Sequence, residues 1–268
     1  MTVAVRITVA ALALGVAACA GRPAATTQEA PIATAQSPPA PLDDVVARAV
    51  RASDRSNDDR ALDAGRKPGA LLRFFRIGPG LRVAELGAGR GYTTELLARV
   101  VGPTGTVYAQ NPAFILQRFA EQPFSDRLAK PVMSNVVRLD REFDDPFPAD
   151  LPPLDAVLIV LVYHDTVWLE VDRAAMNQAV FRALKPGGIY GVVDHSSWPG
   201  RGSSETQSLH RIEESVVRRE IEDAGFVFDD QAFFLRNTKD RRDWNASPSA
   251  AGEMRGASDR FVLRFVKP

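Results

Sequence analysis

The chain has 268 residues, of which 45% are hydrophobic and 25% are charged. This length suits one α/β domain with short appendages, and the composition is ordinary for a soluble globular protein. The 33 basic residues balance the 33 acidic residues. No overall field therefore draws the protein to nucleic acid or to an anionic membrane surface, and we expect a small-molecule substrate as its partner.

The N-terminus predicts export. Arg6 precedes an apolar run, Ile7 to Ala18, that is too short to span a bilayer as a helix and is typical of a secretory signal peptide over residues 1–18. The sequence Val-Ala-Ala-Cys that ends at Cys19 resembles a bacterial lipobox, in which Cys19 would be lipidated and become the mature N-terminus. The alternative is ordinary secretion after cleavage among the small residues around Cys19. Because Cys19 is the only cysteine, a disulfide within a mature monomer is excluded.

Residues 19–41 predict a disordered linker. The segment is rich in Ala, Pro, Thr and Gln and has almost no large apolar side chain. It cannot bury enough surface to offset the entropy lost on ordering. We expect it to tether a domain at residues 42–268 in the periplasm or at the envelope membrane, with membrane contact only through a lipid on Cys19.

Strands and helices are expected to alternate through this domain. The expected strands are 81–84, 106–109, 135–139, 155–162, 189–193, 226–234 and 260–266. The expected helices are 43–52, 68–76, 92–101, 112–130 with a break near Pro123, 170–184 and 211–224. Such alternation implies a parallel sheet with right-handed crossovers, and the last two strands, with no helix between them, imply an antiparallel hairpin. The predicted fold is a doubly wound, seven-stranded, mostly parallel α/β sheet with an antiparallel last strand.

The most informative motif is Glu-Leu-Gly-Ala-Gly-Arg-Gly at residues 85–91. It lies between an apolar strand and a helix, where a glycine turn brings backbone N–H groups close to a bound ligand. A dinucleotide-binding fingerprint needs its third glycine three residues after the second, and this chain has Tyr92 there. The third glycine is instead Gly91, two residues after Gly89, and an acid, Glu85, precedes Gly87 by two residues.

This pattern resembles motif I of the class I S-adenosylmethionine (SAM)-dependent methyltransferases. The Leu-Lys-Pro-Gly-Gly turn before strand 189–193 also resembles the turn before the fifth strand of that family. The resemblance covers roughly residues 68–267 and extends to predicted bacterial methyltransferases that carry signal sequences. It implies a Rossmann-like fold with SAM as the cofactor. It also implies that Gly87, Gly89 and Gly91 wrap the methionine portion of SAM, which Glu85 helps to orient.

The resemblance implies two more cofactor ligands at the ends of the next strands. Most class I enzymes place an acid after the second strand for the ribose hydroxyls, where this chain has Asn111. An amide oxygen can still accept a hydrogen bond there, although without the charge. An acid after the third strand commonly faces the adenine amino group, and Asp140 occupies that place. The alternatives are that Asn111 is a plain turn residue and that Asp140 belongs to a solvated acidic loop.

Arg66 and Lys67 could approach the carboxylate of the cofactor from the N-terminal helices, although an exposed helix start explains them equally well. The segment 236–259 is long for a hairpin connection, and such loops are either functional covers or disordered. Trp244 within it favours an anchored segment.

The three histidines of the chain, His164, His195 and His210, all fall on the predicted ligand-binding edge. His164 and His195 follow strands, and His210 is expected to open the helix after the next loop. Histidine titrates near neutral pH and can take a proton from a nucleophile that attacks a methyl group. We expect His164 and His195 to be catalytic, with His210 as the next candidate.

Two other roles for the histidines stay open. Asp165 and Asp194 flank two of them, so the group could bind a metal. Because no pair of ligands has the i, i+4 spacing, we expect no metal site. The histidines could also orient loops or cap helices.

These observations predict an exported SAM-dependent methyltransferase that acts on a small molecule or an envelope component and aligns the acceptor for in-line displacement at the sulfonium. The rival is an exported ligand-binding lipoprotein that uses the same fold without catalysis, because fold alone does not determine function. The missing acid at Asn111 and the cytoplasmic origin of SAM favour the rival. The retained glycines and the histidine cluster oppose it.

Overall fold

The computed structural model describes residues 4, 8, 10, 11 and 41–268, and the last of these ranges lies in one compact unit. Cys19, and nearly all of the predicted signal peptide and linker, lie outside the described residues. Among the residues that are described, no helix combines the length and the hydropathy needed to cross a membrane.

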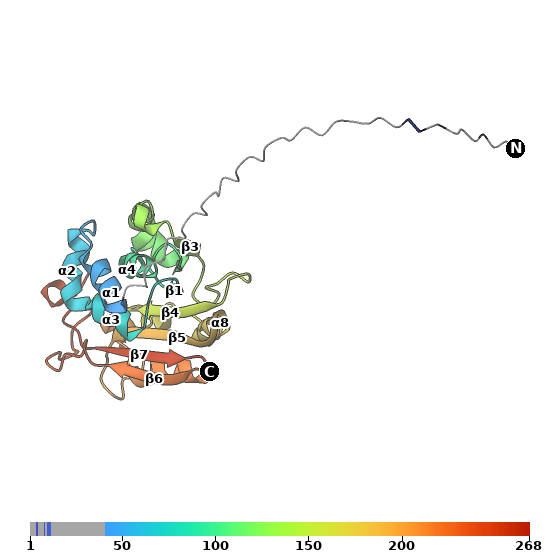
Figure 1. The fold of residues 1–268 in the computed structure, drawn as a ribbon. Coiled ribbons are helices and arrows are strands. Elements are labelled where there is room, and N and C mark those ends of the chain that lie inside the picture. The colour runs from blue at the N-terminus through green and yellow to red at the C-terminus, as the bar shows by residue number, and fades with distance from the viewer. Residues whose placement is uncertain (1–3, 5–7, 9, 12–40) are drawn as a thin grey trace. The chain divides into compact units, whose positions relative to one another are not determined.

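One sheet organises the domain. Its strands are β1 (Arg82–Leu86), β2 (Thr106–Asn111), β3 (Val136–Asp140), β4 (Leu154–Val160), β5 (Leu184–His195), β6 (Val227–Ala232) and β7 (Arg260–Val266). Their order is β3-β2-β1-β4-β5-β7-β6, with β3 and β6 at opposite edges (Figure 1). Strands β1 to β5 pair in parallel, and β7 runs antiparallel to both β5 and β6. The predicted seven-stranded fold with an antiparallel last strand is confirmed.

Helices cover both faces of this sheet. The α-helices are α1 (Leu42–Arg51), α2 (Asn57–Arg66), α3 (Pro68–Phe74), α4 (Tyr92–Val101), α5 (Ala113–Ile115), α6 (Glu121–Leu128), α7 (Asp165–Trp168), α8 (Arg173–Ala183), α9 (Thr206–Leu209) and α10 (Glu214–Asp223). A π-helical segment, η1 (Leu116–Ala120), joins α5 to α6, and the 3-10 helices are η2 (Pro131–Met133) and η3 (Gly252–Met254).

The central strand β4 packs against the helical layers on both faces of the sheet. Its Leu158 packs in one hydrophobic cluster with residues of α1, α3 and α4, whereas Val157 and Ile159 pack in a second cluster with residues of α8 and α10. Successive side chains of a strand point to opposite faces, so a strand between two helical layers must be apolar at every position. The continuous apolar run predicted a strand buried on both faces, and this is confirmed.

Several helix boundaries differ from the sequence expectation. The helix α2 was not expected, and it begins where Ser56 caps the backbone N–H of Asp59 at 3.1 Å. The break expected near Pro123 is absent: α5, η1 and α6 follow one another without a gap, and the irregularity is the π-helical segment η1 before the proline. The expected turn at residues 184–188 is an irregularity within β5.

The prediction that His210 opens a helix was wrong. The helix expected at residues 211–224 begins at Glu214, and His210 instead ends the short α9. Its φ of 51° lies in the left-handed region, which non-glycine residues seldom occupy.

Candidate active site

The glycine turn lies at the carboxyl end of β1, directly before α4. Gly87, Gly89 and Gly91 have φ values of 64°, 56° and 81°, all in the region that glycine adopts without a steric penalty. The turn thus presents the N-terminus of α4 at the edge of the sheet where ligands bind in open α/β folds. The sequence predicted this arrangement of strand, glycine turn and helix.

The three glycines have different surroundings. A Cβ on Gly87 would lie 2.8 Å from Val162 Cγ1, and one on Gly91 would lie 2.8 Å from Arg127 Cδ. A Cβ on Gly89 would meet only a backbone oxygen at 4.0 Å. The protein itself therefore excludes side chains at Gly87 and Gly91, whereas Gly89 has an open side that a ligand could approach.

Two amide side chains at the end of β2 hold this turn. The N–H of Gly87 donates to Gln110 Oε1 at 3.0 Å, and the N–H of Gly89 donates to Asn111 Oδ1 at 2.7 Å. Asn111 Nδ2 donates back to the carbonyl of Gly89 at 3.1 Å. Asn111 lies at the predicted edge, but its amide is bonded to the turn instead of facing open space. Sequence reasoning missed Gln110, although paired amides at a strand end were the signal.

Glu85 lies beneath the turn. Its side chain is buried, and its Oε2 accepts a hydrogen bond from Thr94 Oγ1 at 2.5 Å. Burial raises the pKa of Glu85 to about 7, against the opposing effect of the threonine hydrogen bond. The carboxyl thus links β1 to α4.

Asp140 ends β3 opposite Asn111 in the register of the sheet. Its side chain is half exposed and accepts a hydrogen bond from Arg138 Nε at 2.7 Å. Asp140 therefore shares the edge with the glycine turn, and its carboxylate is paired with a cation.

A small apolar cavity of about 20 Å³ lies beside the turn, between α3, α4 and the ends of β4 and β5. Two guanidinium groups line it. Arg66 stacks over the ring of Tyr92 at 4.5 Å, and Arg260 donates to the carbonyls of Ser258 and Gly256. Within residues 41–268 neither forms an ion pair with a carboxylate. The cavity has about the volume of one water molecule, so the two guanidinium groups place positive charge near the turn without forming a ligand pocket.

Burial acts on both guanidinium groups. It lowers the pKa of Arg260 to about 10, with a further contribution from the nearby charge of Arg66, and it also lowers the pKa of Arg66. Lys67, the other candidate from the sequence, points elsewhere and donates to the carbonyl of Phe234 at 2.6 Å.

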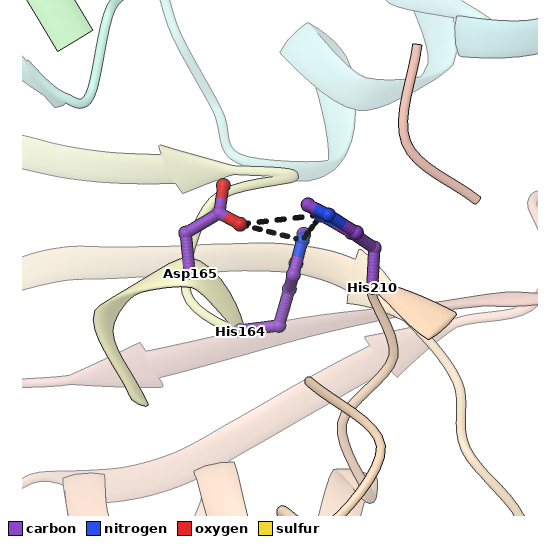
Figure 2. Close-up of side chains that lie close together, drawn as sticks. All are labelled: His164, Asp165 and His210. Atoms are coloured by element: carbon purple, nitrogen blue, oxygen red, sulfur yellow. Dashed lines mark hydrogen bonds and ion pairs between the residues drawn. The ribbon is translucent and has the colours of Figure 1, made fainter. Parts of the chain in front are cut away.

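The structure brings the three histidines together. His164 is buried, and its Nδ1 lies 2.7 Å from Asp194 Oδ1. Its Nε2 lies 3.0 Å from His210 Nδ1 and 3.1 Å from Asp165 Oδ1, and Figure 2 shows these side chains converging. The ring centroid of His195 lies 5.7 Å from that of His164. His164, Asp165 and His210 can each offer a ligand atom to one metal ion.

The two predicted catalytic histidines have opposite electrostatic surroundings. Burial works to lower the pKa of His164, but the carboxylates of Asp194 and Asp165 outweigh it and raise the pKa to about 10. Burial and the nearby charge of His164 hold the pKa of His195 well below its usual value. His195 is therefore the neutral imidazole of the pair at neutral pH, and a neutral imidazole can accept a proton.

The long segment before β7 is anchored over this edge, as Trp244 indicated. Arg211 and Asp240 form a fully buried ion pair at 2.9 Å, and Trp244 Nε1 donates to Asp240 Oδ1 at 2.8 Å. At the end of the segment, Ser258 Oγ lies 2.7 Å from His195 Nδ1. The segment thus covers and orients one of the candidate catalytic side chains.

No model of a known protein family matches the chain. Among solved structures, a SAM-dependent methyltransferase from Aquifex aeolicus is 19% identical, with 79% of this chain and 97% of that chain covered and a TM-score of 0.55. The [4+2]-cyclase SpnF is 18% identical, with 85% and 93% covered and a TM-score of 0.56. Fibrillarin from Aeropyrum pernix, with natively bound S-adenosyl-L-methionine, is 16% identical, with 76% of each chain covered and a TM-score of 0.51. At these identities the likeness concerns architecture, and it shows that the chain has the Rossmann-like fold of the class I SAM-dependent methyltransferases.

Proposed function

We propose that the protein is a SAM-dependent methyltransferase that acts on a small molecule or an envelope component. The observation that carries this proposal is the open side of Gly89, at the carboxyl end of β1 in a methyltransferase fold. A close backbone approach at this turn is what a nucleotide-like cofactor requires. Fibrillarin, which shares the fold, binds SAM, and the retained glycine pattern supports the same cofactor here.

The charge around the turn supports one direction for the bound cofactor. The methionine portion of SAM carries a carboxylate, and Arg66 and Arg260 carry positive charge near the glycine turn. We place the methionine end beside Arg66, which lies over Tyr92 next to Gly91, and the adenosine end toward β2 and β3, where Asn111 and Asp140 lie. Glu85 would act from beneath, by fixing the start of α4 through Thr94.

The histidines at this edge of the sheet supply a candidate general base for the methyl transfer. In the proposed reaction the acceptor attacks the methyl carbon, the bond from that carbon to sulfur breaks, and the proton of the acceptor passes to His195. His195 can accept a proton because burial and the charge of His164 keep it neutral, and its lowered pKa makes it a weaker base than an ordinary histidine. His164, whose ring is held by Asp194, would not accept the proton. It would instead help to position the groups at this edge of the sheet.

The predicted location belongs to the same proposal. The signal-like run at residues 1–18 and the lipobox-like sequence ending at Cys19 support an exported protein that is tethered to the envelope. The acceptor would then be a molecule that is present outside the cytoplasm.

Calorimetry of the purified protein with SAM, S-adenosylhomocysteine and NAD tests the cofactor. We expect binding of the first two ligands and none of NAD, because Tyr92 replaces the glycine of a dinucleotide fingerprint. Incubation with methyl-labelled SAM and fractionated envelope extract then tests transfer. Absence of SAM binding at millimolar concentration would contradict the proposal. Binding without label transfer to any fraction would contradict the enzyme.

A further inference from the structure

We propose that His164, Asp165 and His210 form a binding site for a divalent transition metal of the class that accepts two imidazole nitrogens and one carboxylate oxygen, such as Zn²⁺ or Fe²⁺. The sequence expectation of no metal site rested on the absence of an i, i+4 pair. The ligands come instead from two neighbouring residues after β4 and from one residue at the end of α9. This inference concerns metal binding and goes beyond the proposed methyl transfer.

The three ligand atoms form a nearly equilateral triangle (Figure 2). His164 Nε2 lies 3.0 Å from His210 Nδ1 and 3.1 Å from Asp165 Oδ1, and the last two atoms are 3.3 Å apart. Metal bonds of about 2.0–2.2 Å separate adjacent ligands by about 3.3 Å at tetrahedral angles and by about 3.0 Å at octahedral angles. One ion can therefore reach all three atoms with little movement of the side chains.

The surroundings of His164 fix the side of the ring that faces the triangle. Asp194 accepts the backbone N–H groups of His164 and His195, each at 2.7 Å, and its Oδ1 lies 2.7 Å from His164 Nδ1. An ion that binds here displaces the proton on Nε2, while the proton on Nδ1 stays hydrogen-bonded to Asp194 and Nε2 faces the ligand position. A carboxylate on the outer nitrogen of a metal-binding histidine is the usual second layer of such sites.

The other two ligands are also held in place. Trp168 Nε1 donates to Asp165 Oδ1 at 2.9 Å, so the ligating carboxylate is itself hydrogen-bonded. His210 has a φ of 51°, and a strained conformation of this kind persists only where its surroundings enforce it. Asp165 is thus held by a contact outside the triangle, and His210 by its backbone conformation.

Access to the triangle is from one side. The side chain of His164 is 2% exposed, whereas those of Asp165 and His210 are 20% and 23% exposed. An ion could enter past His210 and keep an open coordination position toward solvent, as metal sites with three protein ligands commonly do. The two carboxylates that contact His164 provide negative charge to balance the ion.

Metal titration of the full chain tests the site without any cofactor. After treatment with a chelator and dialysis, the protein is titrated calorimetrically with Zn²⁺, Co²⁺, Mg²⁺ and Ca²⁺. We expect one equivalent of Zn²⁺ or Co²⁺ to bind, and Mg²⁺ and Ca²⁺ to bind far more weakly because they prefer oxygen ligands. The visible spectrum of bound Co²⁺ would distinguish four-coordinate from six-coordinate geometry, and thus a zinc-like from an iron-like site.

Substitutions assign the binding to these residues. We expect His210→Asn, which keeps a residue that tolerates positive φ, and Asp165→Asn to remove the stoichiometric binding. Asp194→Asn should lower the affinity by about 10–100-fold, as loss of an outer carboxylate typically does. His195→Gln is the matched control, since it changes a histidine on the same edge but outside the triangle, and it should bind as the wild type does.

Two results would overturn the proposal. One is the absence of stoichiometric Zn²⁺ or Co²⁺ binding to the folded wild type. The other is equal affinity in wild type and folded His210→Asn, as judged by circular dichroism. In either case the cluster is a hydrogen-bonded network only. Neither result bears on SAM binding, which is measured separately.

Discussion

Asn111 and Gly89 are joined by two hydrogen bonds of opposite direction. The amide oxygen of Asn111 accepts the N–H of Gly89 at 2.7 Å, and its amide nitrogen donates to the carbonyl of Gly89 at 3.1 Å. A carboxylate has no proton to donate, so the acid common at this place in class I methyltransferases could not make both bonds. The asparagine therefore has a structural role within the glycine turn.

We expect Asn111→Asp to weaken the turn. The substitution would put a buried carboxylate oxygen against the carbonyl of Gly89, and an unsatisfied buried polar group costs about 1–3 kcal/mol. Urea unfolding should show this loss, and the affinity for S-adenosylhomocysteine should fall. Asp140→Asn, at the half-exposed partner position on β3, is the control and should change stability by no more than about 0.5 kcal/mol. Tighter cofactor binding by a stable Asn111→Asp would show that this side chain faces the ribose.

The glycines of the turn allow a matched pair of substitutions. Gly89→Ala places a methyl group in open space, so it should cost only the penalty of positive φ, about 1–2 kcal/mol, while it obstructs the cofactor. Gly91→Ala puts its Cβ 2.8 Å from Arg127 and 3.0 Å from Phe124, so it should destabilise the fold more. Thermal unfolding and calorimetry with S-adenosylhomocysteine check both. Unchanged cofactor affinity in folded Gly89→Ala would place the cofactor elsewhere.

Glu85 gives the protein a stability that depends on pH. Burial raises its pKa from 4.5 to about 7, so the folded state binds the proton more tightly than the unfolded state does. The contribution of Glu85 to stability is therefore fully present below about pH 4.5 and is lost as the pH rises through about 7. At about 1.4 kcal/mol per pKa unit, the loss is on the order of 3 kcal/mol.

Glu85→Gln should remove this dependence, since the amide oxygen can still accept the hydrogen bond from Thr94. The variant should match the wild type in urea unfolding at pH 4.5 and exceed it at pH 8. A difference between the two proteins that does not vary with pH would show that Glu85 stays ionised when it is buried.

The sequence predicted the parts of the fold that repeat a simple physical pattern. The apolar run of β4 and the glycines after β1 each specify one local structure, and both were predicted. The helix α2 was not, because its residues are mostly polar and show no apolar period. Its position depends on tertiary contacts such as the ion pair of Arg55 with Asp63 at 2.7 Å.

The sequence predicted at which edge of the sheet the site lies, but not which side chains contact one another there. Topology alone places His164 and His195 after neighbouring strands. The position of His210 depends on how residues 196–213 fold back, which no periodicity reveals. The same holds for Arg260, which lies at the start of β7 and lines the cavity together with the α2 residue Arg66.

Export and lipidation are tested at Cys19. If the lipobox-like sequence is processed as such, Cys19→Ser should abolish labelling with a radioactive fatty acid and release the protein from the membrane fraction. The wild type should remain in the membrane pellet after a salt wash, because a lipid anchor does not depend on charge. Equal labelling and retention of the variant would refute the lipoprotein proposal. An unlipidated mature chain starting at Ala20 would indicate ordinary secretion.

His195 is the residue that most directly tests catalysis. Its pKa lies well below the usual value because of burial and the nearby charge of His164, so activity that depends on a neutral His195 should fall only at acidic pH. We expect His195→Gln to lower kcat by about 10²–10⁴-fold, the usual contribution of a general base. Affinity for S-adenosylhomocysteine should stay unchanged, because the proposed base contacts the acceptor.

The pH dependence of kcat separates this role from a structural one. The wild type should show an acidic limb in kcat that His195→Gln lacks. A variant whose active site is only less ordered should keep this limb and reach a lower maximal kcat. Ser258→Ala removes the hydroxyl 2.7 Å from His195 Nδ1 and should shift the limb without abolishing it, since Ser258 only positions the ring. An acidic limb that survives in His195→Gln would exclude His195 as the base.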